Sequence, residues 1–485
     1  MVNFFGKKLN ITAGSCRVRT DKPLYPKKMK PVKAQTENHR TRRLLTGRPL
    51  PSLLYFALPI ICGNVFQQLY NIVDAVVVGN YLGSLSLAGI SVAAPLMDVL
   101  YALILGGCIG VSVLTGRAFG AGDSEQLRRT HTTALLGGAG VTLLLSAAGL
   151  FFSRSILLAQ GVSEETATEA MRYLNIILAG LLFSFLYNYL AALLRSCGDS
   201  RSPFLVLLCA STLHALLDVL LVGKLGLGIR GVAFSTVFSQ VLSSAALFLI
   251  IYRNTSRSTM QEALAVPLSA LHFSPAIGRE ILAFSWASAM QQAVVCTGRL
   301  LIQGMLTGLG NEVLSGYNMG MRTEQFLFCF SQGISAALVV SISQNLGNGQ
   351  PDRVKKFYFS AIASVLAASL FTCSLCIFFP GKLIGIFSKD PAVIAAGIAY
   401  TGTMGFAYPF SYCFELAQGF FRGVGKLRLT MIASLTQILL RVPLSYVLIP
   451  RWQIHGICAA VITGWVLLTF LEGGYSLYYL RRNRF

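Results

Sequence analysis

Residues 119–129, FGAGDSEQLRR, have a second copy at residues 346–356, LGNGQPDRVKK. The two stretches are 227 residues apart (346 − 119), and LRSCGD at 194–199 matches FRGVGK at 421–426 with the same offset. Self-similarity at a fixed distance indicates an internal repeat. Because glycine, asparagine and aspartate mark turns, we expect each stretch to be a short connection between two longer elements.

The chain around these turns is strongly apolar. Of its 485 residues, 54% are hydrophobic and 12% are charged, and the mean hydropathy is +0.63. Soluble domains carry about 25% charged residues. The composition therefore predicts an all-α integral membrane protein.

Twelve segments reach the roughly 20 apolar residues that a transmembrane helix needs. They lie at 52–79, 88–115, 131–152, 171–194, 203–223, 231–252, 280–307, 315–342, 357–379, 393–421, 430–449 and 456–479. Six of them separate the two copies of FGAGDSEQLRR, and an even number of crossings leaves both copies facing the same way. Parallel repeats of this kind are a transporter design, in which two halves rock around a central site. The alternative is that the duplication only builds a bundle.

The connections divide the chain into four regions. Residues 1–47 form a basic tail, which we expect to be disordered because it is rich in Lys, Arg, Pro and Thr. An N-lobe at 48–253 and a C-lobe at 279–485 each hold six predicted helices, and a linker at 254–278 joins them. The tail has no continuous apolar run, which argues against a cleaved secretory signal.

Lys and Arg are distributed unevenly between the two sides of this topology. The first 51 residues hold thirteen of the forty, and the side that they define holds thirty in all, against seven on the other side and three within spans. Basic loops stay in the cytoplasm. We therefore expect a multi-pass plasma-membrane protein with both termini cytoplasmic, whose net charge of +21 reflects topology and contact with anionic lipids rather than nucleic-acid binding.

The first predicted span carries a polar stripe. Asn64, Gln67, Asn71 and Asp74 are spaced 3, 4 and 3 residues apart, so they share one face of a helix. Polar groups that face lipid are costly, so this face should line the bundle interior or a wet cavity. Asp74 lies seven residues before Tyr81, about 10 Å from the outer end of the helix.

The fifth span carries a second stripe, Ser211, His214 and Asp218, spaced 3 and 4 residues apart. Asp218 lies eight residues before Gly226, at nearly the depth of Asp74. Two carboxylates at one depth can converge on a site for H⁺ or for Na⁺, with the side-chain carbonyls of Gln67 and Asn71 as further oxygen ligands. Alternatively, each aspartate is a satisfied structural hydrogen bonder.

Five stretches carry a resemblance to a known family. They are LPIICGNVFQQLYNIVDAVVVGNYLG (58–83), the second span around Pro95, GRAFGAGD (116–123), LRSCGDSRSP (194–203) and LHALLDVLLVGKLGLGIRGVAFSTVFSQ (213–240). Over residues 48–480 the chain resembles the multidrug and toxic-compound extrusion (MATE) family, most closely its DinF/MepA-like branch. The resemblance implies a secondary antiporter with two pseudo-symmetric six-helix lobes.

The resemblance also implies that Asp74 and Asp218 belong to an N-lobe coupling site. The branch usually has Asn-x-x-x-Asp in the fifth span, where this chain has His214-x-x-x-Asp218. His214 either holds Asp218 in place or titrates and joins a proton relay. Asp98 in the second span either faces the same cavity or has a helix-packing or loop-facing role.

The C-lobe carries arginines where the N-lobe carries acids. Its polar positions and a few N-lobe ones are the candidates for a substrate cavity: Asn64, Tyr70, Asn188, Gln292, Arg299, Arg322, Gln325, Glu415 and Arg441. The three arginines either pair with glutamates inside the lobe, close an outer gate, or bind an anionic part of the substrate. Tyr187, Tyr408 and Tyr412 either line the cavity or pack in the core.

These features predict a transporter and not an enzyme, because the sequence has no HExxH motif, nucleophile elbow or P-loop. We expect an H⁺- or Na⁺-coupled antiporter that exports amphipathic organic compounds by alternating access, without a cofactor and as a monomer. Its partners would be small organic substrates and membrane lipids. A flippase for lipid-linked precursors is the alternative, although such flippases commonly have two more helices than the twelve counted.

Overall fold

The computed structural model describes residues 42–159, 161–253 and 259–482, and every regular element in them is helical. The α-helices are α1 (Arg43–Thr46), α2 (Pro49–Tyr81), α3 (Ser84–Ala121), α4 (Ser124–Ala159), α5 (Glu164–Ala179), α6 (Leu181–Ser196), α7 (Arg201–Asp218), α8 (Gly228–Arg253), α9 (Thr259–Glu262), α10 (Pro275–Leu306), α11 (Asn311–Gly347), α12 (Pro351–Phe378), α13 (Pro380–Gly385), α14 (Pro391–Gly405), α15 (Tyr408–Val424) and α16 (Leu427–Arg481). A π-helix, η1 (Val219–Lys224), continues α7, and two 3₁₀ turns lie at η3 (Leu268–Ala270) and η4 (Thr307–Leu309). The part of the tail before residue 42 lies outside the described residues.

Within the described residues, eight helices are long and apolar enough to cross a membrane. The number is nine if α5 and α6, which meet at an angle of 48°, form one span. The predicted fourth span is therefore bent at Gly180. The predicted eleventh and twelfth spans both fall within α16, whose backbone leaves helical geometry at Gln453 (φ 49°, ψ −125°) just after Pro450.

The repeated turns have matching backbone conformations. Gly122 and Gly349 occupy equivalent positions in the first repeat and have φ of 70° and 67°. Gly198 and Gly425 occupy equivalent positions in the second and have φ of 91° and 82°. Glycine adopts this left-handed conformation at little cost and is common at helix ends. The repeated glycines are thus required by the turns that end α3, α11, α6 and α15.

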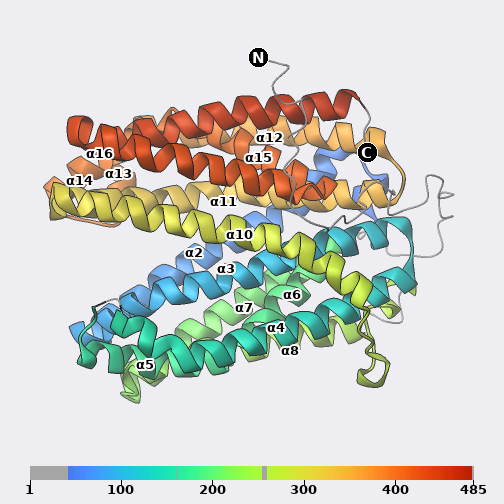
Figure 1. Ribbon diagram of the computed structural model, residues 1–485, viewed down its shortest axis with the longest axis horizontal. Coiled ribbons are helices and arrows are strands. Elements are labelled where there is room, and N and C mark those ends of the chain that lie inside the picture. The colour runs from blue at the N-terminus through green and yellow to red at the C-terminus, as the bar shows by residue number, and fades with distance from the viewer. Residues whose placement is uncertain (1–41, 160, 254–258, 483–485) are drawn as a thin grey trace, which may run out of the picture.

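The buried apolar residues form two large clusters. In Figure 1 the helices form two groups, one mainly blue to green and the other mainly orange to red. One cluster draws on residues 93–264 and the other mainly on residues 302–480. We refer to α2–α8 as the amino-terminal half and to α10–α16 as the carboxyl-terminal half.

Two helices cross from one group to the other. The start of α2, with Leu53 and Phe56, is buried in the carboxyl-terminal cluster, and α2 packs against α11 and α12. Its repeat equivalent α10 packs against α3 and α4 of the amino-terminal half and runs diagonally between the two groups in Figure 1. The exchange of equivalent helices ties the halves together.

Glycines mark the seam where the two halves meet. A Cβ at Gly120 would collide with the backbone carbonyl of Gln344, and a Cβ at Gly347 would collide with that of Arg117. Gly120 and Gly347 are 227 residues apart (347 − 120), as are Arg117 and Gln344 (344 − 117). The seam therefore has an approximate twofold symmetry, and only glycine allows this closeness of the backbones.

A pair of hydrogen bonds closes the same end of the seam. The Arg117 Nη2 donates to the carbonyl of Val424 at 2.5 Å. From the other half, the Gln344 Nε2 donates to the carbonyl of Ser196 at 2.7 Å. Each donor thus binds the end of a helix in the opposite half, and we call these two bonds the seam latch.

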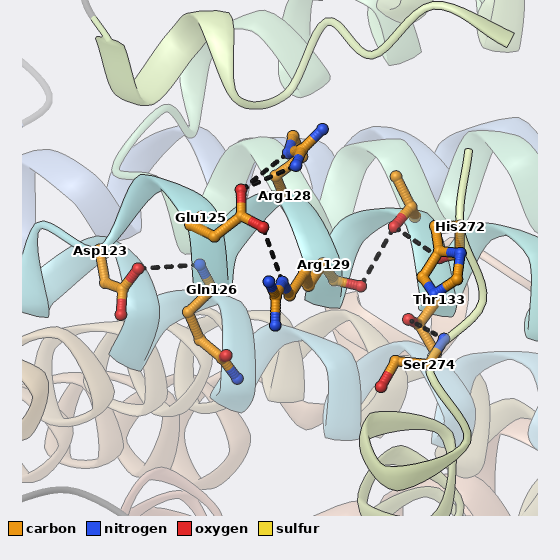
Figure 2. A network of polar contacts seen from close by, with 9 residues as sticks. Asp123, Glu125, Gln126, Arg128, Arg129, Thr133, His272 and Ser274 are labelled. Carbon is orange, nitrogen blue, oxygen red and sulfur yellow. Dashed lines mark hydrogen bonds and ion pairs between the residues drawn. The ribbon is translucent and has the colours of Figure 1, made fainter. Parts of the chain in front are cut away.

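The segment that enters each crossing helix is fastened to the opposite half. Before α2, the carbonyl of Gly47 accepts a hydrogen bond from Arg353 Nη2 of α12 at 2.8 Å. Before α10, the Thr132 Oγ1 of α4 donates to the carbonyl of His272 at 3.0 Å, and the Ser274 amide donates to Thr133 Oγ1 at 3.1 Å. Figure 2 shows the second attachment beside the first turns of α4. We call these segments the entry straps.

Candidate functional site

The polar stripe of α2 is only partly enclosed. Asp74 and Asn64 are half-buried, whereas Gln67 and Asn71 are exposed. The Asp74 Oδ1 itself is buried and has no hydrogen-bond partner among the described residues. The stripe therefore delivers one carboxylate, and not its amide neighbours, to a buried environment.

The second carboxylate lies where α7 changes to a π-helix. Asp218 is the last residue of α7, and η1 begins at Val219. Segments of π-helix are often found at functional sites because they redirect side chains within an otherwise regular helix. Asp218 and His214 are 0% and 2% exposed. Their i,i+4 spacing places the His214 Nδ1 2.9 Å from the Asp218 Oδ2, although the pair does not have hydrogen-bond geometry.

Hydroxyl groups from two other helices complete the surroundings of His214. Its Nε2 lies 3.0 Å from the Tyr70 hydroxyl on α2, 3.0 Å from Thr236 Oγ1 and 3.3 Å from Ser235 Oγ, both on α8. The Ser235 hydroxyl also donates to Asp218 Oδ1. The imidazole can therefore accept from a hydroxyl when neutral and donate to one when protonated.

Asp74, His214 and Asp218 form one cluster. A ligand atom from each lies within 4.8 Å of the ligand atoms of the other two. Neighbouring buried carboxylates repel each other when both are charged, so the cluster favours the uptake of positive charge. The structure thus brings together the two aspartates and the histidine that the sequence singled out.

Ser235 and Thr236 are the contributors that the sequence analysis missed. Both lie within the stretch 213–240 but are not among the predicted site residues. Their signal was an adjacent pair of hydroxyl residues in an apolar helix. Each hydroxyl also lies within hydrogen-bonding distance of the carbonyl of Val232, and such internal bonds usually make a helical serine or threonine structurally neutral.

The remaining predicted site residues do not join this cluster. Asn188 donates to the carbonyl of Ser184 within its own helix, and Gln292 is half-buried. Arg322, Gln325 and Asp98 are exposed. The side chain of Arg299 lies outside the described residues. The described candidates for the substrate cavity thus differ in their exposure.

Two charged candidates in the carboxyl-terminal half have distinct surroundings. Glu415 pairs with Arg422 at 3.2 Å. Arg441 is half-buried, and its Nε is buried without a hydrogen-bond partner among the described residues. Arg441 is the repeat equivalent of His214 (441 − 214 is 227). Arg441 therefore occupies the position at which the amino-terminal half has His214, the centre of its cluster.

The aromatic candidates divide in the same way. Tyr408 and Tyr412 are fully buried in the carboxyl-terminal cluster, so in this conformation they are packing residues and do not line a cavity. The Tyr412 hydroxyl is also satisfied, because it donates to the carbonyl of Leu327 at 2.5 Å. Tyr187 is half-buried, and Tyr70 contacts His214 edge to face. Tyr70 is thus the aromatic candidate that belongs to the cluster.

Comparisons with known proteins agree over most of the chain. The sequence profile described as MatE matches residues 59–220 and 287–447. The chain is 26% identical over 401 residues to the probable multidrug resistance protein YpnP of Bacillus subtilis, which covers 82% of this chain and 88% of that protein. It is 27% identical over 346 residues to an FAD transporter of Shewanella oneidensis, over 70% of this chain and 75% of that one.

The fold matches a solved structure over almost its whole length. A crystal structure of a MATE protein in its straight conformation superposes with a TM-score of 0.84, at 20% sequence identity, over 92% of this chain and 99% of that one.

Proposed function

Since the family profile covers more than half of it, the chain belongs to the MatE family, the multidrug and toxic-compound extrusion transporters, and on this premise we propose that it exports amphipathic organic compounds in exchange for a cation. It is a secondary transporter and not an enzyme. The observation that carries the exchange is the buried cluster of Asp74, His214 and Asp218.

The cluster provides the charge change that coupling requires. Ionisable groups inside a membrane are costly, and they typically mark ion pathways or proton relays. Its three residues lie on α2 and α7, and α8 supplies the hydroxyls of Ser235 and Thr236 beside them. Binding a cation there neutralises charge between helices, so it favours the conformation in which these helices are packed most closely.

The ligand atoms favour H⁺ over Na⁺ as the coupling ion. Hard cations prefer several oxygen ligands, but here an imidazole nitrogen lies beside Asp218, and Gln67 and Asn71 are exposed. Histidine and aspartate side chains bind and release protons readily. The hydroxyls of Tyr70 and Ser235 hydrogen-bond to His214 and Asp218, so they can relay protons between these side chains. Na⁺ held by Asp74 and Asp218 is the alternative, and no cofactor takes part.

We propose twelve membrane spans arranged in two lobes. Beyond the eight helices identified by length and composition, α5 with α6 and α14 with α15 each form a bent span, α10 forms another, and α16 divides into two at Gln453. The N-lobe would comprise residues 48–253 and the C-lobe residues 279–485, joined by 254–278. The parallel repeat supports this arrangement.

The distribution of basic residues supports a plasma-membrane protein with both termini in the cytoplasm. In that orientation the seam latch lies at the cytoplasmic end and Asp74 lies in the outer half. Closure of the seam by glycine contacts and the latch would make this conformation outward-facing, with alternating access produced by the opening of that seam. We propose that the transporter acts as a monomer in contact with membrane lipids.

Small organic compounds are the proposed substrates. The similarity to a protein named for multidrug resistance supports drug export, and it does not favour a flippase for lipid-linked precursors. Asn64, Tyr70 and Asn188 on one side and Gln292, Arg299, Arg322, Gln325, Glu415 and Arg441 on the other remain the proposed cavity residues. The arginines suit an anionic group on part of the substrate range.

Transport in proteoliposomes tests the exchange. Purified protein is reconstituted and given either a pH gradient or a Na⁺ gradient, and efflux of a fluorescent organic compound is followed. We expect the pH gradient to drive efflux and the Na⁺ gradient to have no effect. Efflux driven by Na⁺ alone would overturn the choice of ion, and efflux that ignores both gradients would overturn the proposed antiport.

Mutants then test whether the cluster acts as one unit. Groups that share a function show non-additive losses. We expect Asp74→Asn, Asp218→Asn and the double mutant to lose transport to the same extent. A double mutant whose loss equals the product of the two single losses would mean that the aspartates act independently.

A further inference from the structure

A series of buried polar side chains, linked by hydrogen bonds, lies in the carboxyl-terminal half. The Gln291 Nε2 on α10 donates to Gln418 Oε1 on α15 at 3.0 Å and lies 2.9 Å from Ser434 Oγ. The Gln418 Nε2 then donates to Glu472 Oε2 on α16 at 2.8 Å. Gln291, Gln418 and Glu472 are 6%, 1% and 7% exposed. This series of hydrogen bonds thus ends at the buried side-chain carboxyl group of Glu472.

Glu472 is not fully satisfied as an anion. Its Oε1 is buried and has no hydrogen-bond partner in the described part of the chain. A buried carboxylate is stable only when donors or opposite charges surround it. Among the described residues, the charged or titratable groups that act on it are Arg422 and Glu415 on α15 and Tyr358 on α12. The hydroxyl of Tyr358 is engaged with Ser476 at 2.5 Å.

Arg422 is the cation among these neighbours of Glu472, and in this conformation it is paired with another acid. Its Nη1 pairs with Glu415 Oε1 at 3.2 Å, while its Nε is buried and unpartnered among the described residues. Arg422 is four residues after Gln418, so it lies one turn along the same face of α15. An unsatisfied donor and an unsatisfied acceptor therefore lie on neighbouring helices.

We propose that Glu472 is a second proton-binding site, separate from the Asp74 cluster, and that Arg422 controls it by exchanging Glu415 for Glu472. In the present conformation Arg422 is held by Glu415, and Glu472 carries a proton. When α15 and α16 shift, Arg422 turns to Glu472, which releases that proton to water. The proposal rests on the proposed proton-coupled transport and extends it to the carboxyl-terminal half.

Infrared spectroscopy of the purified transporter in lipid tests the protonation without any transport. A protonated carboxylic acid has a carbonyl stretch that a carboxylate lacks. We expect the difference between parent and Glu472→Gln at neutral pH to contain this band. Asp74→Asn should leave the Glu472 contribution in place. A parent spectrum without a Glu472 band at neutral pH would show that the group is charged and would overturn the proposal.

The exchange of Arg422 is tested in proteins that keep Glu472. Glu415→Gln frees the arginine, so the band should disappear at a pH lower than in the parent by about one unit or more, the size of effect that a new opposite charge gives. Arg422→Gln should keep the band to higher pH. An unchanged titration in both variants would overturn the exchange, and it would do so even if Glu472→Gln failed to fold.

A transport measurement distinguishes a failure of this inference from a failure of the proposed function. If the parent couples efflux to the pH gradient, Glu472→Gln should lower the number of protons moved per substrate by one while Asp74→Asn abolishes coupling. An unchanged proton count in Glu472→Gln would overturn the second site and leave the first intact. A parent that does not respond to pH would overturn the proposed coupling, and the infrared titrations would still decide whether Arg422 controls the proton on Glu472.

Discussion

The two halves of this protein contain the same repeated turns but differ in where they bury acid. Asp74 and Asp218 of the amino-terminal half correspond, at the 227-residue offset, to Leu301 and Ser445 of the carboxyl-terminal half. Ser445 is fully buried, and its hydroxyl has no hydrogen-bond partner within the described residues. The acidic site of one half has thus become apolar or neutral in the other.

At the opposite end of the helices, the carboxyl-terminal half has the acids and the amino-terminal half has none at the equivalent positions. Glu415 and Glu472 of the carboxyl-terminal half correspond to Asn188 and Ala245. By contrast, the seam residues Arg117 and Gln344 have different side chains but make equivalent bonds. The comparison shows that the contacts between the halves are alike at equivalent positions, whereas the buried acids are not, so the same scaffold holds different sites.

The largest expected effect comes from replacing Asp74, an acid that has no acidic equivalent in the carboxyl-terminal half. Asp74→Asn keeps the shape of the side chain and its capacity to hydrogen-bond but cannot lose or gain a proton. Gradient-driven efflux in proteoliposomes should fall to the level of empty liposomes. Asp390→Asn, which removes a charge from an exposed helix cap where asparagine caps equally well, should transport like the parent. Full transport by Asp74→Asn would mean that the two halves do not differ in coupling.

A bulky residue in the seam should have the next largest effect. Gly120→Val places its side chain against the backbone of Gln344, which cannot yield as a flexible side chain can. Gly107→Val is the matched control, because a Cβ there meets no other atom within 4 Å. We expect only Gly120→Val to prevent closure of this end, measured as labelling of a cysteine introduced at Ser196. Equal labelling in both variants would contradict a tightly closed seam.

Weakening the seam latch should have a smaller effect. Gln344→Ala removes the donor to the carbonyl of Ser196 and leaves a buried carbonyl without its partner, at a cost of about 1–2 kcal/mol. The population of the closed seam should fall about five- to thirty-fold, as measured by distances between spin labels on α6 and α11. Arg117→Gln should shift the equilibrium in the same direction. Opposite shifts would show that the two halves do not contribute equivalently.

The smallest expected effect concerns the equivalent of His214. Arg441→Gln removes a half-buried charge that has no ion pair among the described residues. If Arg441 binds an anionic part of the substrate, affinity for an anionic dye should fall severalfold while affinity for a matched cationic dye stays unchanged. The dyes are titrated into purified parent and variant. Equal changes for both dyes would exclude recognition and assign Arg441 to gating.

Much of the fold followed from the sequence because the repeat is read directly from the residues. The matching glycines predicted turns, and Gly122 and Gly349 both have positive φ. The exchange of α2 and α10 between the halves was not predictable, because hydropathy identifies a membrane helix but not its neighbours. For the same reason, the 227-residue offset suggested two copies and did not show that their first helices cross.

The site was partly predictable on similar grounds. Helical periodicity placed Asp74 on one stripe and His214 with Asp218 on another, and their equal depth predicted that they meet. Periodicity does not tell which third helix approaches, so Ser235 and Thr236 were missed. Glu472 was also missed, since a single acid near the end of an apolar span resembles a residue at the membrane surface.

The entry straps and the crossing of α2 also affect how the protein is made. The start of α2 is buried among helices of the carboxyl-terminal half, and α11 starts 230 positions after the end of α2 (311 − 81). At about 5–20 residues per second, synthesis takes roughly 10–50 s to supply that partner. During this time Leu53 and Phe56 must be covered by lipid or by the insertion machinery. The final packing of the start of α2 therefore waits until α11 and α12 have been synthesised.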